Sequence, residues 1–118
     1  MPTTTTLYRP TGPGELALIG QSGWKRFPPR LPEQPIFYPV TNEPYAAQIA
    51  RDWNVAASGC GFVLKFAVDS RYLAKFEVQN VGAEMHNELW VPAEELEEFN
   101  DHIVGFITVT QSFYPEDK

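Results

Sequence analysis

The chain has 118 residues, of which 43% are hydrophobic and 14% aromatic, and it carries a net charge of −6 with a pI near 4.8. This size predicts one domain with a single core. The acidic balance argues against a nucleic-acid-binding protein, because such proteins neutralise phosphates with clustered Lys and Arg. The single cysteine, Cys60, excludes an internal disulfide and a metal site built from several thiolates.

The N-terminal segment MPTTTTLYRP has neither the basic region nor the apolar stretch of a signal peptide, and no apolar run is long enough to span a membrane. We therefore expect a soluble cytoplasmic protein without a membrane partner. Residues 1–6 and 115–118 are predicted to be polar tails, and residues 7–114 to form the single domain.

The predicted elements are short strands and short helices. Residues 7–10 read as a first strand, and residues 14–21 as a helix that ends at Gly23. The segment KRFPPRLPEQP, residues 25–35, is predicted to be an irregular loop, because its prolines remove backbone donors and block helix. The later elements, in chain order, are a strand at 36–41, a helix at 43–53, a strand at 62–69, a helix at 70–76, strands at 77–82 and 88–92, a helix at 92–103 and a strand at 104–114.

The junction between the strand at 36–41 and the next helix is the best defined. Asn42 stands at the N-cap position, and Pro44 fits the first turn because no backbone donor is needed there. The residues expected to face the core recur at helical spacing and are Tyr45, Ala46, Ile49, Ala50 and Trp53. All three tryptophans, Trp24, Trp53 and Trp90, are predicted to anchor the core. The order of elements predicts an α+β domain with one mixed or antiparallel sheet that splits into two halves.

The chain has no phosphate-binding loop, no dinucleotide fingerprint and no metal-ligand spacing around its two histidines. The remaining candidates are polar residues placed at strands, namely Arg9, Tyr38 with Thr41, and Glu88. An ionisable side chain in a short apolar strand either forms an ion pair or faces a cleft. The structural alternatives are that Arg9 pairs with a carboxylate such as Glu88 across the sheet, that Tyr38 packs in the core, and that Glu88 caps or pairs.

These three positions and the order of elements resemble the ADP-ribosyltransferase-like fold. In that fold a first-strand Arg or His, a strand with Tyr or Ser/Thr before a helix, and a late-strand Glu line one NAD cleft. The chain is also similar, over about residues 7–110, to a group of short bacterial proteins labelled ADP-ribosylation/crystallin J1. The matching blocks are LYRP, RFPPRLPEQPIFYPV, AAQIARDWN and ELWVPAEELEEFN.

The resemblance implies NAD as substrate, with Glu88 as the catalytic residue. Arg9, Tyr38 and Thr41 would bind the dinucleotide, and Arg30, together with Arg26 on the proline-rich loop, would form a lid or a phosphate clamp. A carboxylate at Glu88 would stabilise the positive charge that develops on the ribose when the bond to nicotinamide breaks. The chain would then be an ADP-ribosyltransferase or an NAD glycohydrolase, with a small-molecule nucleotide and a protein acceptor as its partners.

The chain also departs from the family pattern. Arginine-modifying members carry a Glu two residues before the catalytic Glu, where this chain has His86. His86 and His102 are interpreted as surface or satisfied residues. A second function therefore stays open, that of a non-catalytic module of the same fold that binds a nucleotide or a protein.

Overall fold

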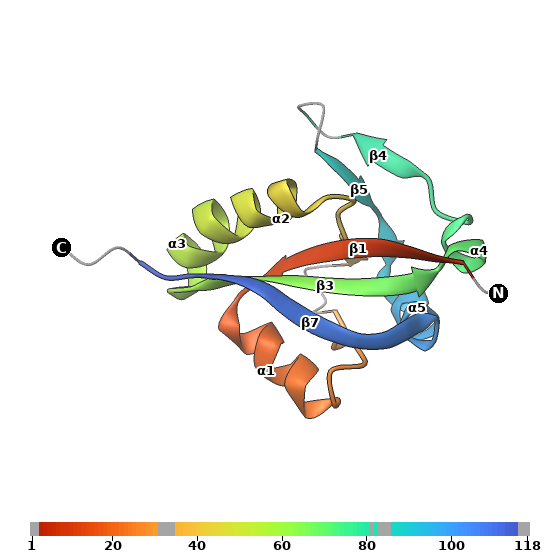
Figure 1. Cartoon of the computed structure of the whole chain (residues 1–118), viewed down its shortest axis with the longest axis horizontal. Coiled ribbons are helices and arrows are strands. Elements are labelled where there is room, and N and C mark those ends of the chain that lie inside the picture. Colours follow the sequence, from red (N-terminus) through yellow and green to blue (C-terminus); the bar gives the residue numbers. More distant parts are fainter. Residues whose placement is uncertain (1–2, 31–34, 81, 83–85, 116–118) are drawn as a thin grey trace.

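A three-stranded antiparallel sheet in the order β1–β3–β7 forms the centre of the fold (Figure 1). These strands are β1 (Thr4–Thr11), β3 (Gly61–Asp69) and β7 (Ile103–Phe113). The computed structural model describes residues 3–30, 35–80, 82 and 86–115. The predicted tails, the proline-rich loop and the strand at 77–82 extend in part into ranges outside the described residues.

A two-stranded ribbon continues this sheet beyond β1. In it residues 36–41 run antiparallel to residues 87–92, through β2 (Ile36–Phe37) against β6 (Val91–Pro92) and through backbone bonds to β5 (Asn87–Leu89). Val40 pairs with Tyr8 of β1 on one side and with Glu88 of β5 on the other. The outer strand β4 (Val78–Asn80) pairs with β5. We call residues 36–41 and 87–92 the ribbon.

The helices cover both faces of the central sheet. One face carries α1 (Pro13–Gln21) and α5 (Leu96–Asp101), which follows the 3-10 turn η2 (Ala93–Glu95). The other face carries one continuous helical segment made of α2 (Glu43–Ile49), the π-helical turn η1 (Ala50–Asn54) and α3 (Val55–Ser58). Figure 1 shows α1 and the α2–α3 segment on opposite sides of the sheet. The short α4 (Ser70–Leu73) follows β3.

Alternation along β3 divides the core into two parts, because successive side chains of a strand point to opposite faces. Leu64, Phe66 and Val68 join the larger core with α1, α5 and the buried ring of Phe37. Val63 joins the smaller core under α2 with Val40. The ribbon therefore contributes to both cores and fixes α2 beside β1.

The fold confirms an α+β architecture, and all of its described strand pairs are antiparallel. The predicted N-terminal tail needs correction, since Thr4, Thr5 and Thr6 belong to β1 and pair with Asp69, Val68 and Ala67. Threonine is β-branched and packs well on a pleated strand, which explains the longer element. No described helix has the length and apolar character needed to cross a membrane.

The tryptophan prediction is wrong. Trp24, Trp53 and Trp90 are all substantially exposed, and Trp53 reaches 72%. The helix that begins at Glu43 also continues past the predicted end at residue 53 to Ser58. Phenylalanines occupy the centre of the core instead, with Phe27, Phe37, Phe66 and Phe99 in tilted and edge-to-face contacts.

Candidate functional site

The ribbon turns three side chains away from the main core. Phe37, Leu89 and Val91 are buried in that core, whereas their neighbours in sequence, Tyr38, Glu88 and Trp90, line a pocket instead. The two-residue period of extended backbone produces this division. Tyr38 and Trp90 are 40% and 44% exposed, and their rings make an edge-to-face contact with centroids 6.4 Å apart.

Three of the predicted site residues line one pocket of about 420 Å³, which we call the Glu88 pocket. Arg9 comes from β1, Tyr38 from the first strand of the ribbon and Glu88 from β5. Ile49 and Asn54 of the α2–α3 segment form another part of the lining. The pocket therefore lies where β1, the ribbon and the helix meet, and an apolar wall with a few polar groups is typical of a small-molecule site.

Glu88 is a buried carboxylate with a donor on each oxygen. Only 9% of the residue is exposed. The Tyr45 hydroxyl donates to Oε2 over 3.0 Å, and the Trp90 indole Nε1 donates to Oε1 over 2.9 Å. Burial, and then the hydrogen bond to Glu88 and its charge, raise the pKa of Tyr45 to about 12. Tyr45 therefore remains a protonated donor at neutral pH, and both partners fix the orientation of the carboxylate.

Arg9 does not pair with Glu88. Its Nε and Nη2 each donate over 2.9 Å to the two carboxylate oxygens of Glu15 on α1. The guanidinium also lies 4.9 Å from the centroid of the Phe37 ring, within the range of a cation–π contact. The pair with Glu15 uses Nε and Nη2 of the guanidinium, and Arg9 also lines the Glu88 pocket.

Arg30 lies next to the same ion pair, with Nη1 3.6 Å from Oε1 of Glu15. Burial works against the charged form of Glu15, but the charge and hydrogen bond of Arg9 and the charge of Arg30 outweigh it, and the pKa of Glu15 is lowered. Burial, followed by repulsion from Arg9, lowers the pKa of Arg30. Two guanidinium groups thus surround one carboxylate, which leaves this part of the site with excess positive charge.

Two further hollows adjoin the Glu88 pocket. A larger one of about 850 Å³, the Trp53 pocket, shares Tyr38 and Ile49 with it and is also lined by Arg30. Another of about 440 Å³, the Gly12 pocket, shares Arg9 and Asn54 with it. Arg30 lines both of these hollows. The three hollows therefore surround the two arginines and Tyr38, and an extended ligand has room to occupy more than one of them.

His86 belongs to the wall of the Trp53 pocket. Its ring stacks on Tyr45 with centroids 4.4 Å apart, and its Nε2 is 3.0 Å from Oε1 of Gln48. The same Tyr45 donates to Glu88, so the tyrosine contacts both His86 and the carboxylate. This placement agrees with the interpretation of His86 as a residue whose ring contacts are satisfied.

The other predicted binding residues lie elsewhere. Thr41 lines none of the three hollows, and its hydroxyl donates to the Asn87 carbonyl over 3.4 Å. Asn42 caps α2 by accepting from the Tyr45 amide over 2.8 Å, so the first-turn donor is already used. The helix start after the ribbon is therefore a structural cap and offers little to an anion.

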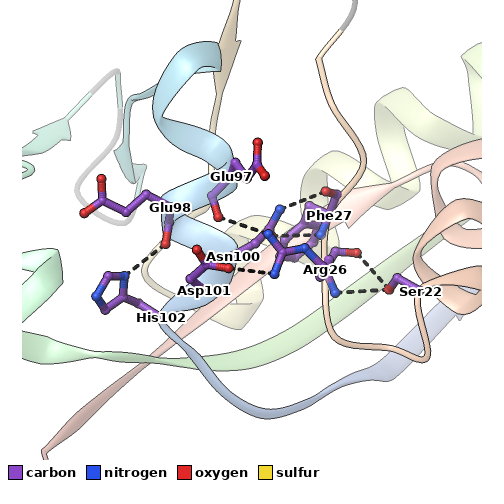
Figure 2. Close-up of polar contacts among 8 residues, drawn as sticks. All are labelled: Ser22, Arg26, Phe27, Glu97, Glu98, Asn100, Asp101 and His102. Carbon is purple, nitrogen blue, oxygen red and sulfur yellow. Dashed lines mark hydrogen bonds and ion pairs between the residues drawn. The ribbon is translucent and has the colours of Figure 1, made fainter.

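Arg26 anchors the proline-rich loop instead of clamping a ligand. It donates to Oδ1 of Asp101 over 2.8 Å and to the Glu97 carbonyl over 3.1 Å (Figure 2). Beside it the Asn100 amide pairs with both backbone groups of Phe27. The two loop arginines therefore differ from each other. Arg26 binds α5, whereas Arg30 lines two of the hollows.

Sequence reasoning missed Glu15, Tyr45, Asn54 and Trp90 as members of the site. Trp90 could have been found, because it follows Glu88 by two residues in the predicted strand at 88–92, where both side chains are expected on one face, and the two are hydrogen-bonded. Glu15, on a predicted helix, carried no signal. Comparison of the chain with protein-family models, with curated proteins and with solved structures gives no match in any of the three.

Proposed function

We propose that this chain has an ADP-ribosyltransferase-like fold, binds NAD across the Glu88 pocket and the adjoining hollows, and cleaves the bond between nicotinamide and ribose. The supporting observation is the convergence of Arg9, Tyr38 and Glu88 on one pocket from three segments that are far apart in sequence. The structural alternative for Arg9 was an ion pair with a carboxylate, and Arg9 does form one, with Glu15 and not with Glu88.

The chemistry of the proposed reaction matches the charges of the pocket. Breaking the carbon–nitrogen bond leaves the electron pair on the nicotinamide nitrogen and develops positive charge on the ribose. Glu88 is held in place by Tyr45 and Trp90 before the reaction, so it stabilises that charge without reorganisation. Water or an acceptor then adds to the ribose carbon and loses its proton to solvent. The guanidinium groups of Arg9 and Arg30 suit the pyrophosphate.

A non-catalytic nucleotide-binding or protein-binding module is the second candidate. It is favoured by the contacts of Glu88 and Arg9, because both Glu88 oxygens already accept hydrogen bonds and the Arg9 fork already holds Glu15. A carboxylate has further acceptor positions, so a third hydrogen bond to a ribose hydroxyl is compatible with this arrangement. The two candidates differ in turnover.

The test is nicotinamide release from NAD by the purified chain, with calorimetric titration of NAD and ADP-ribose in parallel. Glu88→Gln keeps the size of the side chain and removes its charge, and we expect it to lower the rate by about 10²-fold or more. Glu95→Gln is the matched control, because Glu95 also accepts from a tyrosine hydroxyl, that of Tyr72, and lines none of the three hollows. We expect the control to release nicotinamide at the wild-type rate.

The outcomes separate the candidates. Release that depends on Glu88 supports the enzyme. Binding of NAD without release supports the module. If the folded wild-type chain neither binds NAD nor releases nicotinamide, the proposal is refuted.

A further inference from the structure

The Trp53 pocket lies along one side of the helix that begins at Glu43. Its helical lining residues follow one another at spacings that bring side chains to the same side of a helix, and they are Tyr45, Gln48, Ile49, Asp52 and Trp53. Tyr38 of the ribbon and Arg30 line the pocket from other segments. At about 850 Å³ it is the largest of the three hollows around the site.

The π-helical turn η1 places Trp53 at this pocket. In a regular α-helix Trp53 would follow Ile49 and Ala50 onto the face that packs against the sheet. A π turn pairs each residue with the fifth one along the chain, and here the Val55 amide donates to the Ala50 carbonyl. The extra residue shifts the inward position by one and turns Trp53 away from the sheet, toward the pocket. Such turns are frequent at functional sites.

The walls of the Trp53 pocket suit a planar ring. Tyr38 and Trp53 are 40% and 72% exposed, so both aromatic side chains are accessible to a ligand. Ile36 and Ile49 add apolar surface to the lining. Nucleic-acid bases stack on exposed aromatic side chains, because every base has a π-face. We therefore expect a heterocyclic ring in this hollow.

Asp52 determines which kind of ring fits best. It carries the only negative charge among the described residues that line the Trp53 pocket. The hydrogen bond from Arg51 lowers the pKa of Asp52, so its carboxylate is ionised at neutral pH and only accepts hydrogen bonds. The side chain is half exposed, and a carboxylate has acceptor positions beyond the two that Arg51 uses. This charge disfavours a phosphate in the hollow and favours a ring that carries an amino group.

The two arginines indicate how the dinucleotide is divided between the pockets. Arg9 lines the Glu88 pocket, Arg30 lines the Trp53 pocket, and both guanidinium groups lie beside Glu15. In the proposed reaction Glu88 acts on the ribose that carries nicotinamide, so this half of NAD belongs to the Glu88 pocket. A pyrophosphate beside the arginines then directs the other half, adenosine, to the larger Trp53 pocket.

We infer that the Trp53 pocket binds the adenine ring of NAD, stacked on the Trp53 indole, with the adenine amino group donating to the Asp52 carboxylate. The inference rests on the proposed binding of NAD and names the base that the site selects.

The first experiment tests the amino group, by calorimetric titration of NAD and of an analogue with unsubstituted purine in place of adenine. We expect the wild-type chain to bind the analogue about tenfold more weakly, because a hydrogen bond to a charged group is lost. Asp52→Ala removes the acceptor and should bind the two ligands equally. Asp52→Asn keeps a neutral acceptor oxygen and should restore part of the discrimination. The ratio of affinities separates recognition from a structural role, because a loss of stability changes both affinities alike.

The second experiment tests the stacking. Trp53→Ala should bind NAD about tenfold more weakly, as expected for the loss of a stacked base, and Trp53→Phe should recover part of the affinity because it keeps a ring. Phe106→Ala is the matched control, since Phe106 is 61% exposed and lines none of the three hollows, and it should bind NAD as the wild type does. ADP-ribose and nicotinamide mononucleotide separate the two ends of the ligand. Trp53→Ala should weaken the binding of ADP-ribose and leave that of nicotinamide mononucleotide unchanged.

Three results overturn the inference while the proposed function stands. They are equal affinities of the wild-type chain for NAD and the purine analogue, an unchanged NAD affinity in Trp53→Ala, and a loss in Trp53→Ala that is confined to nicotinamide mononucleotide. Failure of the wild-type chain to bind NAD refutes the proposed function, and the inference with it.

Discussion

Replacing Gly61 by alanine tests the close packing of the π turn on β3. The added β-carbon would lie 2.3 Å from the Ala50 carbonyl oxygen and 2.9 Å from the carbonyl carbon, both of them backbone atoms that cannot rotate away. Overpacking of this kind costs about 1–3 kcal/mol of the free energy of unfolding. With about 2.1 cal/mol/K of unfolding entropy per residue, a chain of 118 residues loses about 4 °C of melting temperature per kcal/mol. We therefore expect Gly61→Ala to melt about 4–12 °C below the wild type.

Gly14→Ala is the matched control. The same β-carbon added to Gly14, in the first turn of α1, would meet no atom within 4 Å. Alanine is the better helix former, so we expect a gain of about 0.5 kcal/mol and a small rise in melting temperature. Thermal unfolding followed by circular dichroism gives both values. A Gly61→Ala chain that melts with or above the wild type would refute the close contact between the π turn and β3.

Two further predictions concern charge and exposure. The pKa of Glu15 is lowered from its usual value of 4.5 on folding, so its contribution to stability is complete above that value and is lost as the pH falls through the lowered pKa. The difference in melting temperature between the wild type and Glu15→Gln should therefore be constant near neutral pH and shrink in acid; a difference independent of pH contradicts the ion pair. Trp53 is exposed, so Trp53→Phe should change the free energy of unfolding by less than about 0.5 kcal/mol and remove the tryptophan fluorescence most easily quenched by acrylamide. A large loss of stability would mean that Trp53 lies in the core.

Local chemistry explains the elements that the sequence predicts well. The Asn42 cap forms with the expected geometry because it depends on residues within one helical turn. Strand β3 follows from the alternation of its side chains, and its observed bounds differ from the predicted 62–69 by one residue. In the site, the placement of Arg9, Tyr38 and Glu88 on short strands groups them as candidates, and the shared cleft is what the resemblance to the ADP-ribosyltransferase-like fold implies.

The features that sequence reasoning missed depend on contacts between distant segments. The π turn lies where the helix packs on Gly61. The sequence of the helix does not indicate that its inward-facing position shifts by one residue there. Trp53 was assigned to the core because a regular helical period was assumed throughout. The sequence alone does not say which carboxylate pairs with Arg9. The position of α1 after β1 in the folded chain selects Glu15.

The pairing of Val40 with Tyr8 and Glu88 has a consequence for the order in which the molecule assembles. This one residue joins the first strand, the middle of the chain and a late strand, so the pocket exists only after two long loops have closed. Long loop closures carry an entropic cost that must be met before their contacts can stabilise the chain. Folding of the three-stranded sheet alone therefore leaves the site incomplete, and a ligand that bridges Arg9 and Glu88 stabilises the contacts between these distant segments.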